Sequence, residues 1–243
     1  MIIYGFNPVL EALRSGRVQE VHFESHGGTR MKQLLDLATE RGIRVKHVSA
    51  GVLDRESKQG VHQGVTAEII AVDNYTVSDL LQAAASPALI VVLDNIEDPH
   101  NVGAILRTAE AVGADGIIIQ KRRSASLTGV VGKASAGAIL HLRIATVVNI
   151  ARAIEELKTA GVWTVGLASD ASLSYNLVDW GLPSAIVVGA EGHGLRHLVR
   201  SRCDRLATIP MKGQINSLNV SVAAGIALFE AVRQRSLGQS SVE

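Results

Sequence analysis

The sequence predicts an α/β protein: a carboxyl-terminal domain built on a largely parallel sheet, preceded by a small amino-terminal α/β domain. Strand-like and helical patterns alternate along most of the 243 residues, and 47% apolar residues suffice for a sizeable core. Three stretches beyond residue 93 share one layout, in which an apolar, β-branched run leads through a polar, glycine-containing loop into a helical pattern. Loops at the carboxyl ends of parallel strands bind ligands, so the three stretches predict one composite site.

The amino-terminal domain is predicted to consist of short alternating elements that follow turn and helix-end signals. We expect helices from Asn7 or Pro8 to about Ser15 and over 30–41, and strands over 19–23, 44–48 and 65–72. The Ala-rich segment that ends at Pro87 resembles a joint. We therefore predict domains over 1–73 and 86–243, joined by a linker over 74–85. The small domain shows no group of residues suited to catalysis, so we expect it to recognise the binding partner.

The carboxyl-terminal domain repeats the alternation on a larger scale. We expect strands over 89–93, 116–119, 142–147, 162–167, 186–188 and 206–209, and helices over 102–112, 150–160 and after residue 219. At 100° per residue, Arg107 falls on the side of the 102–112 helix that faces away from its apolar stripe. Taken alone this indicates a solvent arginine, although a helix start attracts phosphate, and Arg107 one turn further could hold an RNA backbone.

The final helix is apolar around its whole circumference. From Val220 to Val232 only Ser221 and Glu230 are polar. A helix of this kind needs burial on more than one side. A twin subunit around a two-fold axis is the most economical cover for its second face, so we expect a homodimer.

Charge and cysteine content exclude several classes of protein. The net charge of +1 says little about partners, and a nucleic-acid binder of this composition must concentrate its basic residues locally. Cys203 is the only cysteine, which excludes an internal disulfide and a multi-cysteine metal site and fits a reducing cytoplasm. The longest apolar run, 88–93, is too short to span a bilayer, and the start of the chain lacks signal-peptide features. We expect a cytoplasmic protein without a membrane partner.

Basic residues gather within 41–47, 55–62, 121–123 and 196–205. Ordinary solvated surface is the better interpretation of any single cluster. The run Lys121–Arg123 is more suggestive, because it follows a strand end on the expected ligand side. The histidines lack the partners and spacing of a metal site, so no metal is expected. Few aromatic residues, 3% of the chain, favour RNA recognition through phosphates, shape and 2′-hydroxyls.

The loop 189–194 holds three glycines and a carboxylate, Glu191. Its spacing differs from the dinucleotide-binding fingerprint, and the sequence has no lysine-bearing phosphate loop. The glycines allow backbone to approach a ligand closely, while a strand-to-helix turn with positive φ explains them equally well. A carboxylate here is not expected to face phosphate. Asn101, Ser217 and Asn219 lie at helix starts, where each could simply be a cap.

Together the three stretches resemble the motifs of a known family. Residues 98–119, 187–196 and 209–235 are similar to the first, second and third motifs of the SpoU branch of the SPOUT class of RNA 2′-O-methyltransferases, in the family's order and spacing. The resemblance continues through the amino-terminal domain, including VHQGV at 61–65, and covers nearly the whole chain. Within the branch, the sequence is most similar to the bacterial enzymes that methylate a guanosine ribose in 23S rRNA.

The resemblance implies a fold, a cofactor and partners. The carboxyl-terminal domain would form a trefoil knot that binds S-adenosylmethionine, and the knot regions of a homodimer would pack together. The amino-terminal domain would adopt a ribosomal-protein-like fold that binds ribosomal RNA. By motif position, the cofactor would contact mainly the backbone of Gly189, Ile209 and Leu218. The positions that match the family's functional residues are Asn101, Arg107, Glu191, Ser217 and Asn219.

The family assigns the role of catalytic base to the arginine that matches Arg107. Guanidinium normally stays protonated in proteins, so clamping the adjacent phosphate and stabilising the developing alkoxide is physically easier. We expect Asn101 and Asn219 to hold the reactive ribose or the loops around it, and Glu191 to organise the second loop.

Other functions compete with this prediction. A tRNA guanosine methyltransferase of the same branch would generally lack this amino-terminal domain, whereas a thiostrepton-resistance rRNA methyltransferase shares the domain plan. A non-catalytic RNA-binding assembly factor would need none of the matched polar residues. A nucleotide-dependent oxidoreductase is disfavoured by the missing dinucleotide fingerprint.

Overall fold

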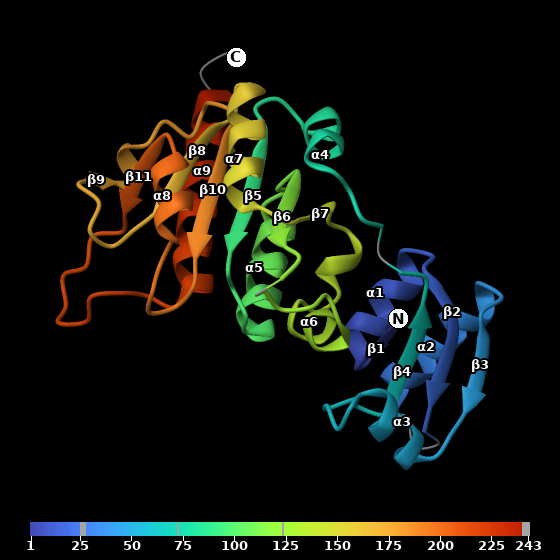
Figure 1. The fold of residues 1–243 in the computed structure, drawn as a ribbon. Coiled ribbons are helices and arrows are strands. Elements are labelled where there is room, and N and C mark those ends of the chain that lie inside the picture. The colour runs from blue at the N-terminus through green and yellow to red at the C-terminus, as the bar shows by residue number, and fades with distance from the viewer. Residues whose placement is uncertain (25–27, 72, 123, 240–243) are drawn as a thin grey trace. The chain divides into compact units, whose positions relative to one another are not determined.

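The computed structural model describes residues 1–24, 28–71, 73–122 and 124–239. It divides into two compact units (Figure 1). The first unit contains Met1–Val72, Val102–Arg107 and Ser126–His141, and the second unit contains Asp73–Asn101, Thr108–Ala125 and Leu142–Glu243. Two short segments that follow residue 100 therefore belong to the first unit, which no local pattern in the sequence indicates.

The second unit is built on a 7-stranded sheet in which every described pair of neighbouring strands is parallel. The strand order is β7-β6-β5-β10-β8-β11-β9. The strands are β5 (Leu89–Asp94), β6 (Gly116–Gln120), β7 (Ile144–Val147), β8 (Trp163–Leu167), β9 (Leu173–Ser174), β10 (Ser184–Gly189) and β11 (Arg205–Thr208). The predicted α/β fold with a parallel sheet is confirmed. Because β10 lies between β5 and β8, the strand order reverses there, and such a switch point opens a crevice at the carboxyl ends of the strands.

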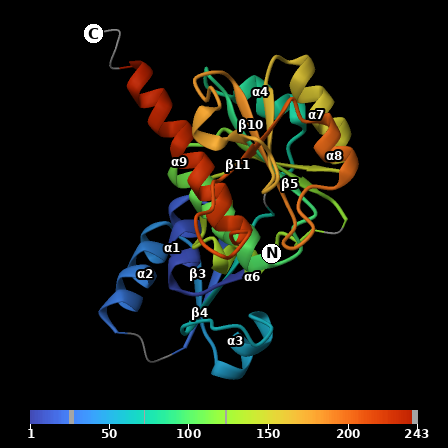
Figure 2. The same ribbon diagram turned by 90° about the vertical axis from the view of Figure 1, so that its left-hand side faces the viewer.

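Helices cover both faces of this sheet (Figure 2). On one face lie α4 (Val77–Ala83), α7 (Ile150–Thr159) and α8 (His197–Arg202), and on the other α9 (Val220–Gln239) packs against β10. Central strands that are covered on both faces need apolar residues at nearly every position. This explains why β5 and β10 are buried along their whole length. Helix α5 (Pro99–Ala111) follows β5 in the chain.

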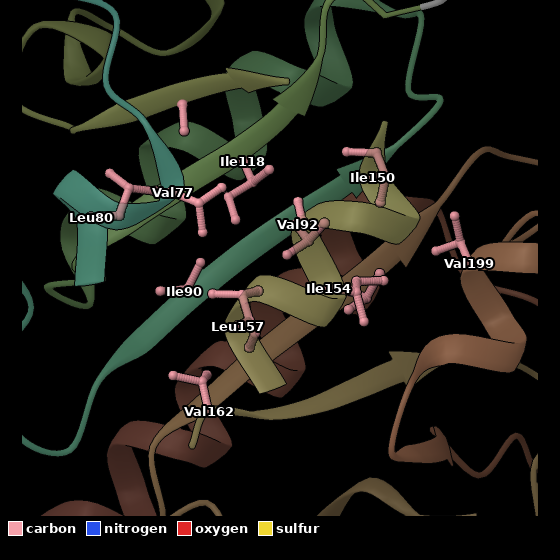
Figure 3. Packing of buried hydrophobic residues seen from close by; sticks show 14 of the residues in the cluster. Val77, Leu80, Ile90, Val92, Ile118, Ile150, Ile154, Leu157, Val162 and Val199 are labelled. Carbon is pink, nitrogen blue, oxygen red and sulfur yellow. The ribbon is translucent and has the colours of Figure 1, made fainter. Parts of the chain in front are cut away.

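A hydrophobic core of the second unit lies between the sheet and α7 (Figure 3). Ile90 and Val92 of β5 belong to the same buried cluster as Ile154 and Leu157 of α7. These side chains are completely or almost completely buried. Since burying one aliphatic side chain of this size contributes about 1.5–3 kcal/mol, packing rather than helix propensity holds α7 on the sheet.

Helix α4 falls in the segment that we expected to be a linker. Thr76 accepts a hydrogen bond from the backbone of Asp79, and the Asp79 carboxylate accepts one from the backbone of Thr76. This capping box begins a helix whose Val77 and Leu80 are buried in the same hydrophobic core. The sequence did not reveal this helix, because the core residues with which Val77 and Leu80 cluster lie far away along the chain.

The first unit contains a 4-stranded mixed sheet in the order β1-β4-β2-β3. Its elements are β1 (Ile2–Tyr4), α1 (Phe6–Arg14), β2 (Val18–Phe23), α2 (Thr29–Glu40), β3 (Arg44–His47), α3 (Ala50–Glu56), β4 (Val65–Ile69) and α6 (Gly129–Ala134). The predicted helices and strands of this part are present, with ends shifted by a few residues. The sequence prediction missed β1, α3 and α6, which are too short to show a periodic pattern.

Candidate functional site

A cavity of about 320 Å³ opens at the carboxyl ends of β8, β10 and β11. Three chain segments and the start of α9 form its walls. The segments are Leu167–Ser169 after β8, the loop that leaves β10 at Gly189, and the chain between β11 and α9. The volume lies within the range of small-molecule sites. The structure therefore has a cavity at the strand ends, where the sequence predicts a composite ligand site.

The structure brings most of the predicted site residues to this cavity. Gly189, Ile209 and Leu218, the predicted cofactor contacts, all line it. Glu191 and Ser217 line it as well. Asn101 and Asn219 lie beside these walls and are described below. Arg107 is exposed on α5 and is not among the residues that line the cavity.

The chemistry of the lining narrows the kind of ligand. Among the described residues that line the cavity, Glu191 is the only charged one, and none is a lysine or arginine. Apolar side chains such as Leu167 and Val188 alternate with backbone that is exposed at glycines. A phosphorylated ligand would need cationic side chains or helix-start N–H groups to balance its charge. The cavity therefore suits a ligand that is uncharged or cationic and carries no phosphate.

The loop after β10 folds back onto the strand that it leaves. The backbone N–H of Gly194 donates a hydrogen bond of 2.8 Å to the carbonyl of Ala190. Gly192 and Gly194 have φ angles of 79° and 63°, which glycine adopts at little cost. A Cβ on Gly189 would lie only 2.2 Å from the backbone of Gly194. The glycines are thus required both by the turn and by this close approach.

Asn219 connects three elements through its side-chain amide. Its Nδ2 donates to Asn101 Oδ1 over 2.9 Å and to Glu191 Oε1 over 2.5 Å. Its Oδ1 accepts the backbone N–H of Ser221 over 2.9 Å, which caps the start of α9. Asn219 therefore caps α9 and also forms hydrogen bonds with two other motif residues. Asn101 is 7% exposed, so this contact is largely shielded from water.

An ion pair between a buried carboxylate and a partly exposed arginine lies at the same end of the sheet and was not predicted. Asp94, the last residue of β5, is fully buried, and its Oδ1 accepts a 2.7 Å hydrogen bond from Arg196 Nε. Arg196 Nη2 also donates to Gln120 Oε1 over 2.7 Å. The sequence signal that could have indicated this pair is the position of Asp94, a charged residue at the end of an apolar run. Its partner lies 102 residues away, so no local pattern could pair them.

The basic cluster over 196–205 is largely neutralised. Three of its arginines contact carboxylates: Arg196 contacts Asp94, Arg200 contacts Asp170, and Arg202 contacts Glu155. The hydrogen bond from Arg200 holds the pKa of the Asp170 carboxyl below its usual value. Lys121 and Arg122 of the other suggestive run are exposed, and Arg123 lies outside the described residues.

Cys203 is half-buried, and burial raises the pKa of its thiol to about 12. Such a thiol is a poor nucleophile at neutral pH. Within the described residues, no group of His, Cys, Asp and Glu side chains is arranged to hold a metal ion. None of the described helices has the length and apolar character needed to cross a membrane.

Comparison with known proteins identifies the family. Residues 88–229 match the model of the SpoU rRNA methylase family. The chain belongs to this family. Residues 2–75 match a second model, described as RNA 2′-O ribose methyltransferase substrate binding. The resemblance that the three motifs carry is thereby confirmed.

Individual relatives extend over almost the entire chain. The protein is 42% identical over 241 residues to the 23S rRNA (guanosine-2′-O-)-methyltransferase RlmB of Xylella fastidiosa, covering 97% of each chain. It is 42% identical over 239 residues to the RlmB protein of Pseudomonas putida, covering 96% of each. Among solved structures, an AdoMet-bound rRNA methyltransferase from Sinorhizobium meliloti has a TM-score of 0.78 and 28% identity. That comparison covers 96% of this chain and 86% of the other.

Proposed function

We propose that this protein transfers a methyl group from S-adenosylmethionine to the ribose 2′-hydroxyl of a guanosine in 23S rRNA. Membership of the SpoU rRNA methylase family supports the reaction class. Relatives of nearly equal length carry the name of the 23S rRNA guanosine enzyme, which supports the substrate. A reaction on ribosomal RNA also supports the expected cytoplasmic location.

The lining of the cavity is the observation that carries the cofactor assignment. S-adenosylmethionine has a sulfonium cation and no phosphate, and when bound it supplies a methyl group already activated for transfer. A cavity in which Glu191 is the only charged residue among the described lining residues fits such a molecule better than any nucleoside phosphate. Its apolar walls fit an adenine ring. Gly189, Ile209 and Leu218, which line the cavity, would hold the cofactor mainly through backbone groups.

Four polar residues would organise the reacting ribose. A 2′-hydroxyl is a poor nucleophile unless its proton is removed or shared, and it must lie in line with the methyl group. The Asn101–Asn219–Glu191 hydrogen bonds hold α5, α9 and the glycine loop in register beside the cavity. Asn101 and Asn219 would thereby hold the ribose or its surrounding loops. Ser217, which lines the cavity, offers a further hydroxyl on the third segment.

Arg107 would clamp the phosphate next to the reacting ribose. It is exposed on α5, the helix that also carries Asn101, so RNA can reach it. A planar fork of donors suits phosphate oxygens and a developing alkoxide better than it suits proton removal. If this is so, Arg107→Lys keeps the charge but loses the bidentate geometry. Nearly full single-turnover rate in that variant would contradict both the clamp and a base at this position.

The first unit would bind the RNA, since residues 2–75 match the substrate-binding family. We propose that it adopts the ribosomal-protein-like fold of these enzymes. We also propose that the chain from β10 to α9 forms the family's trefoil knot. Support comes from the placement of β10 between β5 and β8 and from the shared cavity of the segments that follow β10 and β11.

A homodimer through α9 completes the proposal. The helix buries Ala224, Ala227 and Leu228, yet Val222 and Phe229 are 49% and 58% exposed. Exposed apolar side chains on a helix that is already packed on one face favour a second partner. Phe229→Glu should produce monomers in analytical ultracentrifugation, and an unchanged mass would argue against this interface.

The experiment that tests the function is methyl transfer to 23S rRNA fragments by the purified protein, followed by mass mapping. The expected product carries one methyl group on a guanosine ribose. A methyl group found only on tRNA would instead assign the substrate of the branch's tRNA enzymes. A methyl group on the rRNA site of the thiostrepton-resistance enzymes would assign that substrate. Absence of any transfer, with RNA still bound, would favour the non-catalytic assembly factor.

A further inference from the structure

Both ends of the glycine loop are attached to the last residue of β5. The loop leaves β10 at Gly189, which lies beside Asp94 in the parallel register. It ends at Arg196, whose backbone N–H donates a 2.9 Å hydrogen bond to Asp94 Oδ2. Glu191 and Gly192, which line the cavity, lie between these two attachment points. The position of this wall therefore depends on one buried carboxylate.

Arg196 contacts both oxygens of the Asp94 carboxylate. Besides the backbone bond, Oδ1 accepts from Nε over 2.7 Å, and Nη2 lies 2.5 Å from the same oxygen. The Asp94 side chain is 0% exposed, while that of Arg196 is 39% exposed. A buried carboxylate that loses such a partner is left as an uncompensated charge, so the pair strongly favours the closed loop. Gln120 Oε1 accepts a further hydrogen bond from the same guanidinium.

An arginine within α8 holds a different wall. Arg200 donates two hydrogen bonds, of 2.8 and 3.1 Å, to the carboxylate of Asp170. Asp170 directly follows Ser169, the last residue of the wall after β8. Because α8 begins where the glycine loop ends, the same short helix is tied to both walls. Bidentate geometry makes this pair more restrictive than a single surface contact.

We propose that Asp94–Arg196 and Asp170–Arg200 form an arginine clasp that sets the separation of two cavity walls and hence the affinity for the methyl donor. The four residues are positioning residues that act through the walls. The proposal rests on the proposed function, because it takes the cavity as the donor site. Glu191 lies on the wall that is held by Asp94 and bonds Asn219, so the clasp also orients that polar contact.

The same helix offers a matched control. Arg202 forms an ion pair with Glu155 of α7 at 3.1 Å, and neither residue lines the cavity. The side chains of Arg200 and Arg202 are both partly exposed, at 35% and 51%. R200Q and R202Q therefore remove the same chemistry from one helix, but only R200Q loosens a wall.

The test is calorimetric titration of S-adenosylmethionine into the full-length protein and these variants, with turnover on 23S rRNA fragments measured in parallel. We expect R200Q to weaken donor binding on the order of threefold to tenfold, and R202Q to leave it unchanged. R196K and D94N, which disturb the Asp94–Arg196 pair, should weaken it on the order of tenfold to a hundredfold. The KM for RNA should change much less than the dissociation constant of the donor.

The design separates positioning from general destabilisation. All titrations are made well below each variant's melting temperature, and the swapped pair D170R/R200D should recover most of the donor affinity lost in R200Q. Equal losses in R200Q and R202Q, or a lowered melting temperature with unchanged donor affinity, would overturn the clasp. A wild-type protein that binds no donor would instead refute the proposed function itself.

Discussion

Two walls of the same cavity are held in opposite ways. The glycine loop between Gly189 and Arg196 begins in a buried strand and ends on a buried carboxylate. The segment between β11 and α9 has no regular structure, and most of its residues are exposed, including Ile215 at 72%. Its firmest described attachment is Asn219. One wall is therefore held at both ends, by strand pairing at Gly189 and by the buried Asp94 carboxylate, whereas the other depends on a single side-chain amide.

The largest effect is expected from filling the space that the first wall occupies. Gly189→Ala places a Cβ about where the Gly194 backbone lies, at 2.2 Å, so the loop must move. Because that loop lines the cavity, we expect donor affinity to fall on the order of a hundredfold. Calorimetry with S-adenosylmethionine measures the effect. Gly213→Ala, where a Cβ meets nothing within 4 Å, is the control on the second wall. Similar affinities for both variants would show that the first wall is not held more firmly than the second.

The second wall is tested by separating the two roles of Asn219. Asn219→Ser keeps an oxygen that can cap α9 but loses the amide NH2 group that donates to both Asn101 and Glu191. Asn219→Ala loses both. Turnover should fall on the order of tenfold in each variant, because hydrogen bonds to a charged partner contribute about 1.5–3 kcal/mol.

Stability distinguishes the two variants of Asn219. Only Asn219→Ala loses the cap, at a cost of about 1 kcal/mol in urea unfolding. If Asn219→Ser turned over rRNA at the wild-type rate, the cross-link to Asn101 and Glu191 would have no part in catalysis.

How much of this site the sequence predicts depends on the distance over which its contacts act. The motif residues Gly189, Ile209 and Leu218 were predicted and do line one cavity, because strand ends and loops leave local patterns. The wall Leu167–Ser169 was missed, since a short Ala-Ser turn after a strand looks like any other loop. The Asp94–Arg196 pair was also missed, because periodicity does not encode which charges meet across the sheet. The cofactor contacts themselves, and the roles of Arg107 and Asn101, stay predictions.

Acid should loosen the far end of α8, which ends next to Asp204. Burial alone would raise the pKa of that carboxyl, but hydrogen bonds from Thr164, together with Lys158, outweigh burial and lower the pKa. A lowered folded-state pKa gives stability that is fully present above the unfolded value and is lost as pH falls through the folded value. Urea midpoints from about pH 7 to about pH 3 should therefore decline, and Asp204→Asn should flatten that decline. An identical pH profile in Asp204→Asn would show that titration of Asp204 does not cause the decline.

The smallest effect is expected at the exposed surface of the second wall. Ile215→Ser removes a side chain that is 72% exposed, so the free energy of unfolding should change by less than about 0.5 kcal/mol. Urea unfolding and donor calorimetry should both resemble the wild type. A large loss of donor affinity would mean that this wall folds over the ligand more closely than its exposure indicates.

The most direct measurement is a pair of calorimetric titrations of the wild-type protein, one with S-adenosylmethionine and one with ATP. Both ligands carry adenosine, but only the first is a phosphate-free cation. We expect S-adenosylmethionine to bind and ATP not to bind, because the described cavity lining offers a carboxylate and no lysine or arginine. Binding of ATP with equal or higher affinity, or no binding of S-adenosylmethionine, would contradict this expectation.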